Sequence, residues 1–313
     1  MPTAAEILKA KLDALTDVPD GWARSIDAYQ PRLLTRLNRL LADLELVDGR
    51  IAMTEANLYL IDDIVLGLRK YLTQGEYLEI VTEFSNEFLV QQGRTVSYFG
   101  ALVSGEVPVT SFASAMYQRN RALAVESVLG NVALDSMLLN DVRNTLIEAV
   151  ASNSRYTLTL EAMQNLVIGD PQKEGQLLRY SRQIVSDTFA TTDRAFTKIV
   201  GDELGLQFYR YLGGKMKTTR CFCDVRNGGF FHRKEIEGWG NGVGIGKCDT
   251  GKGWAGMMPN TNEDTIFVNA GGYNCQHSIL PISTFAVPKE VGLSAFEKGY
   301  FEPTRTEKEY FGI

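Results

Sequence analysis

All the cysteines and histidines of the chain lie close together in the sequence. Six residues span 57 positions (277 − 221 + 1) of the 313: Cys221, Cys223, His232, Cys248, Cys275 and His277. Thiolate sulfur and imidazole nitrogen are ligands that zinc prefers. Residues two apart on an extended strand point to one face, so Cys221 with Cys223, and Cys275 with His277, each form a pair that could bind one ion. This stretch therefore indicates a metal site.

Other interpretations of these thiols stay open. The Cys-x-Cys and Cys-x-His spacings differ from those usual in zinc knuckles. A disulfide between Cys223 and Cys275 is a second interpretation, although the cytosol keeps thiols reduced. Buried thiols without a ligand, beside a hydrogen-bonded histidine, are a third.

A catalytic interpretation needs a nucleophile with a base beside it. Cys275 would be the nucleophile, His277 or His232 the base, and Asn274 or Asp224 the orienting group, as in a thiol hydrolase. Residues at i and i+2 on one strand seldom make the required hydrogen bond, which argues against Cys275 with His277.

A phosphate-binding loop is also excluded. Gly246, Gly251 and Lys252 have the spacing of such a loop, but Gly253 stands where a Ser or Thr would bind magnesium. We therefore predict no catalytic and no cofactor-binding residues, and a protein that is not an enzyme.

Basic residues alternate with aromatic residues and glycine in the same stretch, a pattern that can contact DNA phosphate. The DNA-contact candidates are Arg220, Arg226, Arg233 and Lys234. The alternative is a solvated loop surface whose charges are balanced by nearby acids.

The composition limits the class of protein that positions these residues. The chain is 44% hydrophobic and 22% charged, which excludes disordered and collagen-like classes. Its net charge of −6 argues against a nonspecific DNA coat. No apolar stretch approaches the roughly 20 residues that span a bilayer, and the first residues resemble an amphipathic helix rather than a signal peptide, so we expect no membrane association.

Charge and glycine divide unevenly along the chain. Residues 1–205 carry 19 basic and 27 acidic residues, a net charge of −8, whereas residues 206–313 carry 13 and 11, a net charge of +2. Glycine is enriched in the second part, with 17 of the 29. We predict a helical domain at 1–205, a small Cys/His domain with α/β or β-rich structure at 206–285, and an extended aromatic tail at 286–313.

The first part has helical periodicity. Leucines at three- and four-residue spacing follow Pro31, which is tolerated in a first helical turn. Thr54 is a candidate cap for the next helix, and Gly75 a break after it. Further helices are expected at 112–127 and 133–151, with one long helix at 176–202. The fold class is α+β, with a mainly α-helical N-terminal domain and a small, glycine-rich, β-containing C-terminal domain.

The second part has shorter elements. Residues 206–212 form an aromatic run typical of a strand, and residues 215–220 are expected to return as a second strand. A short helix is expected at 233–239, a glycine-rich loop at 238–256 and a strand at 265–268.

Several motifs between about residues 175 and 281 resemble a known family. They are Leu178-Arg179-Tyr180 with Gln183, Phe208-Tyr209-Arg210-Tyr211, Thr218-Thr219-Arg220-Cys221-Phe222-Cys223, Gly229-Phe230-Phe231-His232, and Gly271-Gly272-Tyr273-Asn274-Cys275-Gln276-His277 with Pro281. Their order and spacing are similar to those of the minor head proteins of tailed phages, the head-morphogenesis family related to the Mu F-like proteins. Gln276 stands where that family usually has arginine, and Cys221 and Cys248 are additions to its pattern.

The resemblance implies a structural role in a virion. Such a protein associates with the portal protein and other capsid or neck proteins at the capsid interior or portal vertex, after assembly in the host cytoplasm, and in some cases contacts packaged double-stranded DNA. It also moves the expected metal ligands to Cys223, His232, Cys275 and His277, a Cys₂His₂ set that fits structural zinc. Two alternatives stay open: a toxin-like or nuclease-like effector on the C-terminal domain, and a DNA-binding module.

Overall fold

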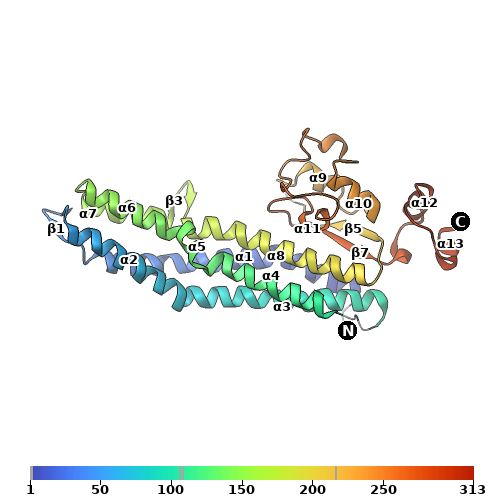
Figure 1. The fold of residues 1–313 in the computed structure, drawn as a ribbon, viewed down its shortest axis with the longest axis horizontal. Helices are drawn as coiled ribbons and strands as arrows, with labels where there is room; N and C mark the ends of the chain where they lie inside the picture. The colour runs from blue at the N-terminus through green and yellow to red at the C-terminus, as the bar shows by residue number, and fades with distance from the viewer. Residues whose placement is uncertain (1–2, 106, 108, 216) are drawn as a thin grey trace. The chain divides into compact units, whose positions relative to one another are not determined.

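The computed structural model describes residues 3–105, 107, 109–215 and 217–313. The chain is 66% helical with a few small antiparallel sheets, which confirms the predicted α+β, mainly helical class. Figure 1 shows the elements in chain order. Contacts divide the chain into two compact units. The predicted domain boundary near residue 205 follows composition and stays a prediction.

The helical unit consists of Val18–Glu87 and Ala122–Ser186. It takes its residues from nine helical segments, of which the first, third, fourth and last also supply residues to the other unit. These segments are α1 (Ala4–Leu41), α2 (Glu55–Gln74), α3 (Glu76–Val103), α4 (Ser111–Leu129), α5 (Asn131–Leu134), a π-turn (Asp135–Leu139), α6 (Asn140–Ala151), α7 (Tyr156–Val167) and α8 (Gln176–Glu203). Two hairpins join helices, β1 (Leu46–Val47) with β2 (Arg50–Ile51) and β3 (Gly169–Asp170) with β4 (Lys173–Glu174).

Several helix boundaries agree with the sequence. The Thr54 hydroxyl accepts a hydrogen bond from the Asn57 amide and caps α2, and the helix ends at Gly75. α8 covers the predicted helix at 176–202. Pro31, in contrast, lies in the interior of α1, so the prediction that it marks a first turn is wrong. Ile26, Tyr29, Leu33 and Leu37 are all fully buried, and this continuous stripe stabilises the helix across the proline.

Within the part of the chain that the structure describes, one helical stretch has the length and apolar composition of a membrane span. This stretch is Ser111–Ala151, and 39% of its most apolar segment is buried inside the protein. The core helices of many proteins share these properties, so a single such stretch is weak evidence for a membrane. The expectation of no membrane association stays a prediction.

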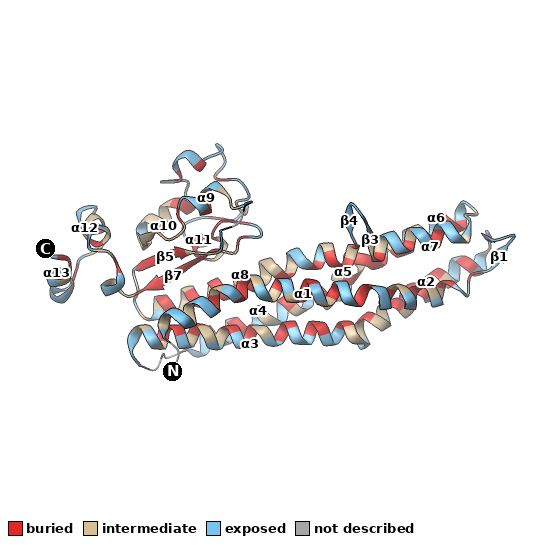
Figure 2. Cartoon of the chain, turned by 180° about the vertical axis from the view of Figure 1, so that it is seen from behind, coloured by how far each residue is buried: buried red, intermediate tan, exposed pale blue. Residues whose placement is uncertain are grey.

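The sheet unit consists of Met1–Asp17, Phe88–Arg121 and Asp187–Ile313. Its three-stranded antiparallel sheet has the order β6 (Phe230–His232), β5 (Phe208–Leu212), β7 (Ser278–Ile282). Figure 2 shows the strands β5 and β7 as buried. Short helical elements surround the sheet: α9 (Cys221–Asp224), α10 (Arg233–Gly240), a 3₁₀ turn (Gly246–Cys248), α11 (Ile266–Asn269) and a 3₁₀ turn (Thr284–Ala286).

Two predicted strands of this unit are wrong. Among the described residues of 215–220 none is in a strand, because β5 pairs with β6 and β7 instead. Residues 266–269 form the helix α11. The Asn262 side chain accepts hydrogen bonds from the amides of Asp264 and Thr265, and the Asn262 carbonyl accepts one from Ile266, which starts a helical turn.

The prediction of an extended tail is also wrong. The last residues form α12 (Lys289–Glu297) and α13 (Arg305–Phe311). Thr304 and Glu307 form a capping box that starts α13. Phe301 and Phe311 both contact the buried ring of Phe208, so the aromatic residues anchor helices.

Candidate metal centre

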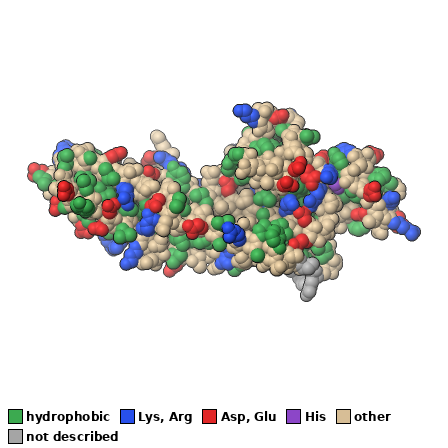
Figure 3. Space-filling model, viewed as in Figure 1, with side chains coloured by type: hydrophobic (Ala, Val, Ile, Leu, Met, Phe, Trp, Pro, Cys, Tyr) green, Lys and Arg blue, Asp and Glu red, His purple; other side chains and the backbone are tan. Residues whose placement is uncertain are grey.

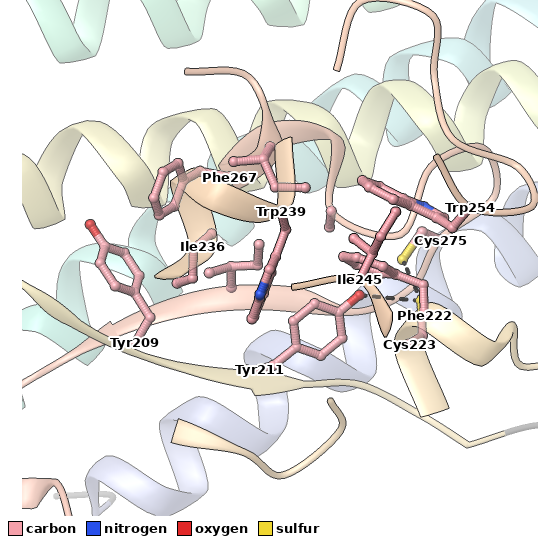
Figure 4. Close-up of a cluster of buried hydrophobic side chains, with 13 residues drawn as sticks. Tyr209, Tyr211, Phe222, Cys223, Ile236, Trp239, Ile245, Trp254, Phe267 and Cys275 are labelled. Atoms are coloured by element: carbon pink, nitrogen blue, oxygen red, sulfur yellow. Dashed lines mark hydrogen bonds between the residues drawn. The ribbon is translucent and has the colours of Figure 1, made fainter. Parts of the chain in front are cut away.

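The candidate site lies at one end of the strand β5. The register pairs Leu212 of β5 with Ser278 of β7, which brings His277 next to the end of β5. Tyr211 of β5 is fully buried there. The helix α9 supplies Cys223 and the loop before β7 supplies Cys275, so three separate segments meet at this point (Figure 4).

Three ligand atoms of this site are close together. The sulfurs of Cys223 and Cys275 are 3.7 Å apart, and the Cys275 sulfur is 4.0 Å from His277 Nδ1. All three candidate ligand atoms lie within 4.8 Å of one another. The three residues are buried, with exposed fractions of 3% for Cys223, 5% for Cys275 and 4% for His277.

Two glycines make room for the sulfurs and the imidazole. A Cβ atom at Gly271 would lie 2.2 Å from the Cys223 sulfur and 2.8 Å from the Cys275 sulfur. A Cβ atom at Gly213 would lie 2.5 Å from Cγ of His277. All three distances are below any real Cβ contact, so this packing requires glycine at both positions.

Arg194 of α8 holds the loop that carries two of the ligands. Its guanidinium donates hydrogen bonds to the carbonyl oxygens of Cys275, His277 and Val268. The Asp187 carboxylate accepts a hydrogen bond of 2.6 Å from the backbone amide of Asn274. The φ of Asn274 is +53°. The loop is therefore fixed to α8 on both sides of Cys275.

The electrostatics favour one thiolate in the pair of thiols. The pKa of Cys275 is well below its usual value, because the Cys223 thiol donates a hydrogen bond to it and because His277 and Arg194 lie nearby. The pKa of Cys223 is raised by the same hydrogen bond and by burial. A thiolate is the form of cysteine that binds a metal.

The distance between the sulfurs fits zinc. Zinc–sulfur bonds of about 2.3 Å in a tetrahedron place two sulfurs about 3.8 Å apart, close to the 3.7 Å found here. Cys223, Cys275 and His277 could therefore bind a metal ion, with two thiolates and one imidazole as ligands. In the catalytic interpretation, which the sequence already disfavours, Cys275 would need a short hydrogen bond to His277, but 4.0 Å separates the sulfur from His277 Nδ1.

His232, the fourth expected ligand, lies elsewhere, and its place in the predicted set is a correction. It pairs with Phe208, four residues before the end of β5 at Leu212. A strand rises about 3.3 Å per residue, which places His232 about 13 Å from the site. Its ring stacks on Tyr300 and Phe301. His232 Nδ1 also accepts a hydrogen bond from the Lys234 amide and so caps α10.

The other two cysteines pair with each other. Cys221 and Cys248 form a disulfide, whereas Cys223 and Cys275 are free thiols, so the alternative of a Cys223–Cys275 disulfide is not what the structure has. Cys221 and Cys248, which are additions to the pattern of the phage family, are therefore the two cysteines that form the disulfide.

The DNA-contact candidates differ in how far they can reach a ligand. Arg226 is 5% exposed and lies against the rings of Phe222 and Trp239, so its selection as a DNA contact is wrong. Arg233 forms an ion pair with Asp202. Arg220 is partly exposed, and Lys234 is exposed with an ion pair to Glu237.

Sequence reasoning missed two residues of the site. Tyr211 donates a hydrogen bond of 3.2 Å to the Cys223 sulfur, and Arg194 is 2% exposed with three carbonyl partners. Tyr211 belongs to an aromatic run that predicts a strand, and Arg194 lies within the long helix predicted at 176–202, so neither stood out as a ligand or as a partner of one.

Comparison of the chain with protein-family models, with curated proteins and with solved structures finds no match. The resemblance to the phage minor head proteins therefore rests on the sequence motifs alone.

Proposed function

We propose that the chain is a structural and assembly protein of a tailed-phage head, a minor head protein that associates with the portal and the capsid interior. The observation that carries this proposal is the burial of the candidate metal centre. Its three ligand residues are at most 5% exposed, so an ion held there would stabilise the loop and would not meet a substrate.

The proposed ion is structural zinc. It would join α9 to the loop before β7, in a region whose large glycine-rich loops bury few aliphatic side chains. Metal binding in such a region contributes directly to folding free energy. The burial of the site supports this role over that of a toxin-like or nuclease-like effector.

The surface of the helical unit supports a protein partner. Figure 3 shows hydrophobic side chains among acidic ones over α2, α6 and α7. The exposed apolar residues of this unit include Leu46, Val47, Met53, Leu58, Tyr59, Leu66, Ile147 and Leu158. The unit carries 12 basic and 19 acidic residues, a net charge of −7. Apolar residues within an acidic surface fit a partner with apolar and basic residues, as we propose for the portal or a neck protein.

Copurification tests the portal proposal. The full chain is expressed with the portal protein of the same phage, and the complex is isolated through a tag on the portal. Leu58→Glu and Leu66→Glu are expected to reduce the recovered chain at least tenfold, because a charge enters the apolar contact. Glu79→Gln is the matched control on the same unit. Absence of the wild-type chain from the portal fraction and from virion density near the portal would refute the proposal.

Double-stranded DNA is a second proposed partner, and a gel shift with the purified full chain tests it. Binding through Arg220 and Lys234 should weaken steeply as salt rises. A gel shift at low salt that Arg220→Ala reduces supports this contact. If the full chain shows no shift at low salt, DNA is not a partner.

A further inference from the structure

The three residues of the candidate metal centre leave one corner of a tetrahedron, and a phenol lies beside it. The Tyr211 oxygen is 3.2 Å from the Cys223 sulfur (Figure 4). The point where a Cβ atom at Gly271 would stand lies 2.2 Å, 2.8 Å and 3.3 Å from the Cys223 sulfur, the Cys275 sulfur and the Tyr211 oxygen. The two sulfurs and the Tyr211 oxygen therefore lie close together beside the backbone of Gly271.

We infer that Tyr211 supplies the fourth donor atom, so that the centre takes a borderline divalent cation such as zinc in a Cys₂-His-Tyr set. This inference rests on the metal centre of the proposed function. Bonds of about 2.3 Å to sulfur and about 2.0 Å to oxygen place the two donors about 3.5 Å apart in a tetrahedron. The oxygen and the sulfur are 3.2 Å apart, and the two sulfurs 3.7 Å, so both edges are near the required lengths.

The burial of Tyr211 argues against water in the fourth position. Its exposed fraction is 0%, and its ring contacts those of Phe222, Trp239 and His277. Catalytic zinc sites hold water at an open fourth position. Here the corner faces a buried aromatic side chain that ends in oxygen.

Metal titration of the full chain tests the inference. The wild type is stripped of metal and titrated with zinc and with cobalt(II). We expect one ion per chain, a sulfur-to-cobalt charge-transfer band, the intense visible bands of four-coordinate cobalt, and the near-ultraviolet absorption of a tyrosinate that forms as zinc binds.

Tyr211→Phe removes only the oxygen and keeps the ring in its contacts. It should weaken zinc binding by at least tenfold and abolish the tyrosinate signal, while the sulfur-to-cobalt band remains. Tyr209→Phe is the matched control, because Tyr209 is buried in the same strand and its hydroxyl is bonded to Arg233. It should bind zinc like the wild type, with the tyrosinate signal intact.

The outcomes separate the two proposals. If the wild type binds metal and Tyr211→Phe retains both affinity and the ultraviolet change, Tyr211 is not a ligand and the metal centre stands. If neither the wild type nor Tyr209→Phe binds metal, the centre itself is refuted, and the role of Tyr211 with it. Circular dichroism of both variants establishes that the fold is intact.

Discussion

Position 271 admits no side chain beyond hydrogen. A Cβ atom there would overlap the sulfurs of Cys223 and Cys275, which are held by α9 and by the bonds of Arg194. We predict that Gly271→Ala lowers the free energy of unfolding by about 1–3 kcal/mol, the usual cost of overpacking, and abolishes metal binding. Denaturant unfolding and metal titration measure both effects.

Gly214→Ala is the control for this change. It lies in the same unit, and nothing is within 4 Å of a Cβ atom at this position. It should leave both the free energy of unfolding and the metal stoichiometry unchanged. Equal effects of the two substitutions would show that the overlap with sulfur is not the cause.

His232 makes stability depend on pH. Burial among aromatic rings, with Arg233 and Lys234 nearby, lowers the pKa of His232 to about 4. An unfolded histidine has a pKa of about 6.5, so below that pH the unfolded state binds the proton first. The contribution of His232 is therefore complete above pH of about 6.5 and decreases as the pH falls toward 4.

The expected loss over this window is about 3 kcal/mol, from about 1.4 kcal/mol for each pKa unit. The measurement is the free energy of unfolding of the wild type and of His232→Asn at a series of pH values. Asn retains a helix cap but does not titrate. A difference between the two proteins that stays constant with pH would contradict the shifted pKa.

The elements of the sheet unit are joined by a buried ion pair. Lys11 of α1 forms an ion pair with Asp193 of α8, and both are at most 2% exposed. Thr95 of α3 accepts a hydrogen bond of 2.8 Å from Lys11 and donates one of 3.2 Å to Asp193. We predict that Lys11→Met costs about 3–5 kcal/mol of the free energy of unfolding, because it leaves the Asp193 charge buried without its partner.

Two further proteins make this prediction specific. Lys11→Met combined with Asp193→Leu should recover most of the loss, because no unpaired charge remains. Lys9→Met removes an exposed pair with Asp13 on the same helix and should have no measurable effect. A double variant as unstable as Lys11→Met would assign the loss to packing instead of charge.

Elements with a long periodic pattern were predictable from the sequence, as were the short strand β5 and the short helix α10, whereas other short elements were not. The periodic pattern of α8 extends over many residues. The cap at Thr54 follows a local rule, because a Thr hydroxyl accepts a hydrogen bond from an amide in the first helical turn. Residues 266–269 are apolar enough for either a strand or a helix, and the hydrogen bonds of Asn262 decide between them. The helices α12 and α13 depend on a capping box and on contacts with Phe208, which lies far away in the sequence.

The candidate site was predictable in part for the same reason. Cys223, Cys275 and His277 stand out by residue type. The exclusion of His232 follows from its register against Phe208, which residue spacing does not give. Tyr211 contacts Cys223, and Arg194 contacts the carbonyl of His277. Both contacts depend on how β5 and α8 pack, which the sequence does not give.

For the whole molecule, zinc binding should raise the free energy of unfolding. A ligand at a thousand times its dissociation constant stabilises the folded state by about 4 kcal/mol. We predict an increase of this size when zinc is added to metal-free protein, measured by denaturant unfolding. Cys275→Ser should not respond to zinc. A wild type that does not respond either would refute the metal centre.

The positions of the two units along the chain determine the order in which they can fold during synthesis. The helical unit is complete when residue 186 has been made, whereas the sheet unit needs segments from both ends of the chain. Lys11 is separated by 182 residues from Asp193. At about 5–20 residues per second, a ribosome takes roughly 10–40 s to supply that partner. During that interval the first turns of α1 cannot pack into the sheet unit, because the rest of that unit has not been made. A factor that binds nascent chains could bind these turns during that time.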